Sequence, residues 1–173
     1  AGAGGHAGTL SPFALVQEIR EWFNGPLLLS GAIANGGAVL AAQSMGADLA
    51  YIGSAFIATD EANANQKYKE MIASSNADDI IYTNLFTGVH GNYLKPSIKA
   101  QGMDPENLET SDSSKMNFSS GASKPKNWKD IWGSGQGISA VKSVGPAKML
   151  IDRLKEEYEE SKNRIINEDW IKT

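Results

Sequence analysis

Cysteine is absent from the 173 residues of the chain, and its absence excludes disulfide bonds, thiolate metal sites and a cysteine nucleophile. Long apolar runs are missing too, since none approaches the roughly 20 residues that a membrane-spanning helix needs. Positive charge is not in excess, because 16 Lys and Arg stand against 20 Asp and Glu, for a formal net charge of −4. Nucleic acids and anionic membranes bind to clustered Lys and Arg residues. We therefore expect a cytoplasmic protein whose partner is a small molecule or another protein.

The chain also lacks a methionine at its start. It opens on a glycine-rich run, residues 1–8, with no apolar element ahead of it. The remaining composition, 41% hydrophobic and 21% charged, is ordinary for a globular domain. We expect a fragment of a longer protein. The alternative is a chain that covers its exposed sheet edges by pairing with a second copy or with another chain.

The first half of the chain alternates between helix and strand patterns. Ser11 and Pro12 are a helix-start signal, and apolar residues follow at helical spacing up to Phe23. Residues 27–29 and 49–52 are short apolar runs typical of strands buried on both faces. Between them, Asn35 is placed to cap a helix that ends at Gly46. Two strands joined by such a helix predict a parallel, right-handed βαβ unit.

The second half is less regular. The pattern predicts a third helix from Thr59 to about Ser74 and a strand over residues 80–86. Residues 99–130 show no sustained period. A last helix is expected after Gly145 and Pro146, with Glu156, Glu157, Glu159 and Glu160 mostly facing water. We accordingly divide the chain into three parts, residues 1–98, an irregular excursion over 99–137, and a helical segment over 138–173.

Small residues follow directly after the two predicted parallel strands. Ser30, Gly31 and Ala32 follow the first, and Gly53 and Ser54 follow the second. Backbone N–H groups of such loops can point together at one anion, and small side chains let the anion approach the backbone. A phosphate site is one interpretation of this pattern. Ordinary turn chemistry is the other, since glycine is also frequent where a strand ends.

Four blocks of sequence carry a resemblance to a known family. Residues 4–8, 29–36, 40–48 and 53–61 match, in order and in register, the successive signatures of the nitronate monooxygenase (2-nitropropane dioxygenase) family. Residues 83–94 and 132–137 resemble later family features more loosely. The resemblance implies an α/β fold, the carboxy-terminal part of an FMN-binding (β/α)8 TIM-type barrel, in which residues 99–137 would pass over the barrel mouth.

The resemblance also implies roles for individual residues. The FMN phosphate would be bound by the two loops, and the flavin would lie along the glycines near the start; these cofactor-binding residues are Gly4, Gly5, Ser30, Gly31, Ala32, Gly53 and Ser54. His6 matches the catalytic histidine of the family. It would act as general base toward a C–H bond next to a nitro group, or orient the substrate, and imidazole suits this because it is available in its neutral form near neutral pH. The implied substrates are a nitronate or nitroalkane and molecular oxygen, and no metal is implied.

Two departures from the family pattern concern the phosphate loops. Ala32 stands where the family usually has a second glycine, and Ser54 stands where it usually has threonine. The added methyl group of alanine is expected to weaken phosphate binding rather than to abolish it. Serine keeps the hydroxyl group of threonine.

Other interpretations stay open. Without the family, a histidine in a glycine-rich loop is more often structural than catalytic, and His90 is expected to be structural. Trp132 and Gln136 lie in a glycine-rich loop that either packs, which we favour slightly, or covers the flavin edge. The alternative activities are an FMN- and NADH-dependent enoyl-[acyl-carrier-protein] reductase, whose barrel shares the glycine and histidine signatures, and a non-catalytic phosphate-binding or assembly module.

Overall fold

The computed structural model describes residues 1–110 and 130–167. The part that agrees best with the sequence pattern is the unit formed by β2 (Leu28–Ser30), α2 (Gly36–Ser44) and β3 (Leu49–Tyr51), preceded by α1 (Pro12–Arg20). Strands β2 and β3 pair in parallel, as the sequence predicts. The side chain of Asn35 accepts a hydrogen bond from the backbone N–H of Ala38 at 2.7 Å, so it is the expected cap of α2.

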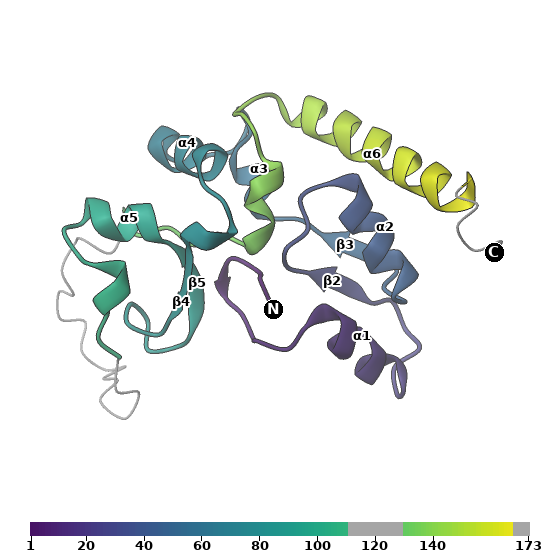
Figure 1. Cartoon of the computed structure of the whole chain (residues 1–173), viewed down its shortest axis with the longest axis horizontal. Helices are drawn as coiled ribbons and strands as arrows, with labels where there is room; N and C mark the ends of the chain where they lie inside the picture. The colour runs from purple at the N-terminus through teal and green to yellow at the C-terminus, as the bar shows by residue number, and fades with distance from the viewer. Residues whose placement is uncertain (111–129, 168–173) are drawn as a thin grey trace.

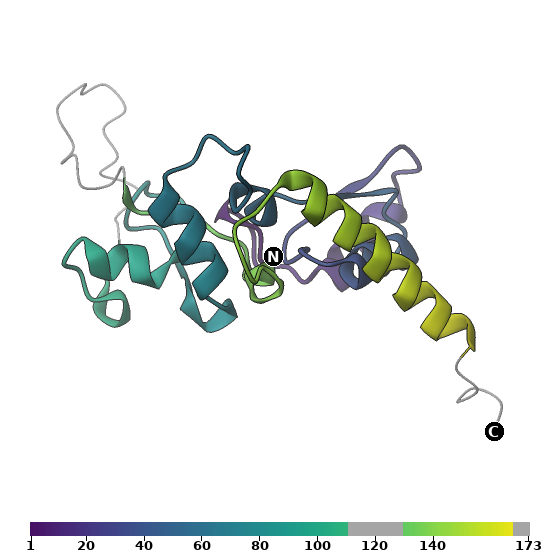
Figure 2. The same cartoon turned by 90° about the horizontal axis from the view of Figure 1, so that it is seen from above.

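The remaining strands form a second sheet. β1 (Gly5–His6), β4 (Ile80–Thr83) and β5 (Gly91–Leu94) pair antiparallel in the order β1-β5-β4. The helices are α3 (Ser54–Ile57), α4 (Gln66–Ser74), α5 (Lys95–Ala100) and α6 (Ala147–Asn167). Figures 1 and 2 agree in placing the β4–β5 hairpin and α5 at one end of the molecule and α1, α2 and α6 at the other, with the N-terminal segment between them.

Two predicted elements differ in the structure. The helix expected from Thr59 begins only at Gln66, because Thr59 forms a bridge to Gly145, the Asp60 N–H donates to the Gly145 carbonyl at 2.9 Å, and the chain turns directly after this contact. The strand expected over residues 80–86 ends at Thr83, where the chain turns back into β5. Of the predicted irregular excursion, residues 111–129 lie outside the described part, and the division at residues 98 and 137 stays a prediction.

The strands β2 and β3 are not buried on both faces, so that prediction is wrong. Leu29 points into a cluster with Val16, Ala42 and Ala47, but Leu28 and Leu49 on the opposite face are 51% and 60% exposed. Tyr51 on the same face is 63% exposed. Parallel sheets usually have both faces covered, whereas only the Leu29 face of this sheet is buried.

Helix α6 packs on α2 through a glycine. A Cβ atom on Gly36 would lie 2.2 Å from the Tyr158 backbone nitrogen, so only glycine permits this approach. Glu157 does not face water as expected, because its Oε2 accepts from the Gly36 N–H at 2.8 Å and its Oε1 lies 3.3 Å from Arg153. Arg153 also donates to the Ala34 carbonyl at 3.1 Å. The end of the loop after β2 is thus held by α6.

Among the described residues, no helix has the length and apolar character needed to cross a membrane.

Candidate functional site

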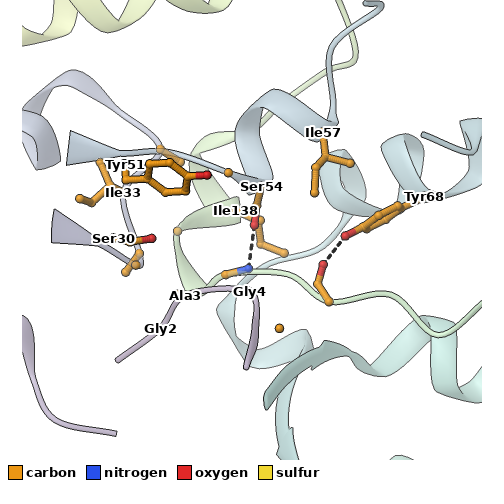
Figure 3. Close-up of a pocket in the computed structure, with 18 residues that line it drawn as sticks. Gly2, Ala3, Gly4, Ser30, Ile33, Tyr51, Ser54, Ile57, Tyr68 and Ile138 are labelled. Carbon is orange, nitrogen blue, oxygen red and sulfur yellow. Dashed lines mark hydrogen bonds between the residues drawn. The ribbon is translucent and has the colours of Figure 1, made fainter. Parts of the chain in front are cut away.

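A cavity of about 340 Å³ lies between the carboxyl ends of β2 and β3 and the N-terminal segment. Figure 3 shows Ser30 and Tyr51 on one side of it, Ser54 near the middle and Tyr68 on the other side. All seven residues predicted to bind the cofactor line this cavity: Gly4, Gly5, Ser30, Gly31, Ala32, Gly53 and Ser54. The structure therefore brings three separate stretches of sequence to one place. None of the lining residues carries a charge.

Backbone and hydroxyl donors in the cavity are available to a ligand. Within the described part of the chain, the peptide N–H groups of Gly53 and Ser54, where α3 begins, have no backbone acceptor. The Ser54 Oγ accepts from the Gly135 N–H at 2.8 Å, which leaves the Ser54 hydroxyl hydrogen free to donate. Ala32 differs from the expectation, since its N–H already donates to the Gly2 carbonyl at 3.1 Å.

The cavity wall is built by close backbone contact. The Gly2 carbonyl accepts from the N–H groups of both Ala32 and Gln136, at 3.1 and 2.9 Å. A Cβ atom on Gly31 would lie 2.4 Å from the Ala1 carbonyl oxygen, and one on Gly137 would lie 2.7 Å from the Ala32 carbonyl. Glycine is required at both positions, because any larger residue would push the three segments apart.

Ala32 has an unfavourable backbone conformation. Its φ of +56° is in the left-handed region, and within the described ranges no other residue except glycine has a positive φ. A left-handed backbone costs an L-residue roughly 1–2 kcal/mol, and glycine avoids that cost. The glycine that the resemblance leads us to expect at this position would not carry that cost.

The third wall of the cavity contains none of the residues assigned to the cofactor from the sequence, although one interpretation placed the loop of residues 132–137 over the flavin edge. It consists of Gly133, Gly135 and Gly137 together with Tyr68. The Tyr68 hydroxyl donates to the Gly133 carbonyl, and burial raises the pKa of Tyr68 to about 12. Trp132 stacks on Tyr68 with ring centroids 5.0 Å apart, so it packs as we favoured. The alternating glycines of residues 133–137 are the sequence feature that could have indicated this wall. The residues around them in the sequence do not indicate that they contact residues 30–34.

His6 lies one residue beyond the cavity lining. It belongs to β1, is exposed, and is not a lining residue, although Gly5 is. Its Nε2 lies 2.7 Å from the Thr87 Oγ1. His90 instead stacks on Tyr82, with ring centroids 5.0 Å apart. The described residues contain no group of three His, Cys, Asp or Glu able to hold a metal ion.

Comparison with known proteins agrees with the resemblance seen in the sequence. The sequence profile described as "Nitronate monooxygenase" matches residues 1–157. The chain belongs to the nitronate monooxygenase family. A probable nitronate monooxygenase from Staphylococcus haemolyticus is 25% identical over 172 residues, covering 90% of this chain and 48% of the relative. Nitronate monooxygenase from Paraburkholderia phytofirmans is 27% identical over 175 residues, covering 92% of this chain and 47% of the relative.

Solved structures resemble the fold over nearly the whole chain. Nitroalkane oxidase from Streptomyces ansochromogenes matches with a TM-score of 0.70 and 25% identity, over 94% of this chain and 51% of that one. FabK from Thermotoga maritima matches with a TM-score of 0.69 and 21% identity, over 94% and 53%. These matches confirm the predicted α/β fold. The chain spans about half the length of the relatives it matches.

Proposed function

We propose that the cavity binds the phosphate group of flavin mononucleotide, and that the chain is the carboxy-terminal part of a (β/α)8 barrel that oxidises nitronates or nitroalkanes with molecular oxygen. One observation carries the proposal. The seven residues that the family resemblance assigns to the cofactor come from three segments between residues 4 and 54, and all of them line one cavity.

The chemistry of the lining fits a phosphate group. The N–H groups of Gly53 and Ser54 belong to the loop that follows β3, and successive backbone N–H groups of this kind bind anions without a cationic side chain. Ser30 and Ser54 add hydroxyl groups. Since no lining residue is charged, an anion here meets no carboxylate that would repel it.

The residues of the chain then have separate tasks. The two loops hold the phosphate end, and the N-terminal glycines let a flat ring lie close to the backbone. When bound, the flavin supplies the electron acceptor for the substrate and the reductant for oxygen. His6, one residue beyond the lining, removes the proton from the carbon next to the nitro group. A neutral imidazole near physiological pH suits that task.

Binding of FMN and of riboflavin, which lacks the phosphate, tests the phosphate site. We expect FMN to bind at least about tenfold more tightly than riboflavin, corresponding to about 1.4 kcal/mol, in a titration followed by flavin fluorescence. Ser54→Ala should weaken FMN binding without changing riboflavin binding, and Ser54→Thr, which keeps the hydroxyl, should resemble the wild type. Equal affinity for the two flavins would overturn the phosphate assignment.

The oxidoreductase part has a separate test. Nitroalkane-dependent oxygen uptake by the flavin-loaded protein should disappear in His6→Ala, while FMN affinity stays the same. A protein that consumes NADH without oxygen would favour the reductase alternative. Unchanged behaviour of His6→Ala in every assay would favour a binding module.

A further inference from the structure

We propose that Thr87 is a positioning residue for His6: it accepts a hydrogen bond from Nε2–H and so leaves Nδ1 as the imidazole nitrogen that takes up a proton. The catalytic meaning of this inference rests on the proposed function. The hydrogen bond between His6 and Thr87 is present in the structure whatever the function is.

The direction of the hydrogen bond follows from the surroundings of the Thr87 hydroxyl. The Thr87 Oγ1 lies 3.0 Å from the Val89 carbonyl oxygen and 2.7 Å from the His6 Nε2. Two oxygen atoms at that distance attract each other only if a hydrogen lies between them, and a carbonyl group has none. The Thr87 hydroxyl therefore donates to Val89. Its only hydrogen is then used, so toward His6 it can only accept, and Nε2 carries the proton.

The β4–β5 hairpin brings Thr87 to His6. Thr87 lies in the turn between the two strands, where Gly88 has a φ of +77° that favours glycine. The ladder of β1 on β5 then places His6 opposite Gly91. Two residues that are 81 positions apart in the sequence meet because β1 pairs with β5, next to the turn that carries Thr87.

The same hairpin holds the backbone on both sides of His6. The Asn92 Nδ2 donates to the Ala3 carbonyl at 2.7 Å, and the Tyr82 hydroxyl donates to the Ala7 carbonyl at 2.7 Å. His6 is exposed, so packing restrains its ring less than it restrains a buried side chain. The strand contacts fix the backbone, and Thr87 fixes the ring.

The tautomer decides which atom acts as base. With the proton on Nε2, the lone pair of Nδ1 is free to accept the proton of a nitroalkane C–H bond, whose electrons stay on the substrate as the nitronate. The imidazolium formed keeps its Nε2–H hydrogen bond to Thr87. A nitronate substrate has already lost that proton, so its turnover should depend less on Thr87.

NMR of the imidazole nitrogens tests the hydrogen bond without any activity assay. The chain has only two histidines, and His90→Gln identifies the signals of His6 in the ¹⁵N-labelled full chain. We expect His6 to have a protonated Nε2, an unprotonated Nδ1, and an Nε2–H that is protected from exchange with water. Thr87→Val, of similar shape, should lose this protection, and Thr87→Ser should keep it. A proton on Nδ1 in the wild type, or equal exchange in Thr87→Val, would overturn the inference.

Kinetics of the holoenzyme separate this inference from the proposed function. For a nitroalkane, Thr87→Val should lower kcat/KM by about twofold to tenfold, a fraction of what a general base contributes, with rescue by Thr87→Ser and a smaller effect on the nitronate. If the NMR result is as expected but both His6→Ala and Thr87→Val turn over the nitroalkane as fast as wild type, the role of His6 as base is wrong. The Thr87 hydrogen bond would still stand.

Discussion

Replacing Ala32 by glycine should stabilise the protein, against the usual effect of adding a glycine. The φ of Ala32 is +56° and its side chain is exposed, so the substitution relieves an unfavourable backbone conformation and loses no buried methyl group. Removing the cost of a left-handed backbone at an L-residue stabilises the folded state by about 1–2 kcal/mol. The greater conformational freedom of glycine in the unfolded chain lowers the stability by roughly 0.5–1 kcal/mol. From the midpoints of these two ranges, the net expectation is a gain of about 0.75 kcal/mol.

Urea denaturation of Ala32→Gly measures this gain, and the corresponding rise in Tm is about 1–4 °C for a chain of this length. The matched control is Ala41→Gly, because Ala41 is also exposed but lies within α2, where glycine costs about 1 kcal/mol. The same change should thus have opposite signs at the two positions. If both variants lose stability to the same extent, the backbone strain assigned to Ala32 is wrong.

Three further changes test other contacts. Gly36→Ala places a Cβ 2.2 Å from the Tyr158 backbone nitrogen and should cost about 1–3 kcal/mol in thermal unfolding. In Gly37→Ala the nearest atom is the movable Ser161 hydroxyl at 3.0 Å, so this control should change little; similar losses would contradict the close α2–α6 packing. The pKa of Asp48 is lowered from its ordinary value of 3.8 by the hydrogen bond from the Leu27 N–H and then by Arg20. Its contribution is present above pH 3.8 and lost as the pH falls through the lower folded pKa, so the stability difference between wild type and Asp48→Asn should shrink between pH 6 and pH 3, and a constant difference would be evidence against this linkage. Burial raises the pKa of Tyr68 from 10.0 to about 12, so its contribution is present below pH 10 and lost as the pH rises through 12; Tyr68→Phe should lose less stability than wild type between pH 9 and pH 11, and equal losses would argue against burial of this hydroxyl.

Much of the first half of the chain was predictable because its signals are local. The cap at Asn35 and the apolar runs of β2 and β3 depend on residues that are neighbours in sequence, and the parallel pairing follows from the helix between the strands. The family blocks cover this same region, so the sequence alone was enough to single out the loops after β2 and β3 as candidate cofactor loops.

The rest was decided by contacts between segments that are distant in sequence. Residues 133–137 complete the cavity through backbone contacts with Gly2 and Ala32, and the alternating glycines that permit these contacts do not indicate which distant segment they approach. Glu157 has the sequence surroundings of any acidic residue on a solvated helix, and only the packing of α6 brings it to the N–H of Gly36. Thr87 gains its partner only because the β4–β5 hairpin pairs with β1. Local sequence determines which helices and strands form, whereas the cavity and the orientation of His6 depend on which of those elements come to lie side by side.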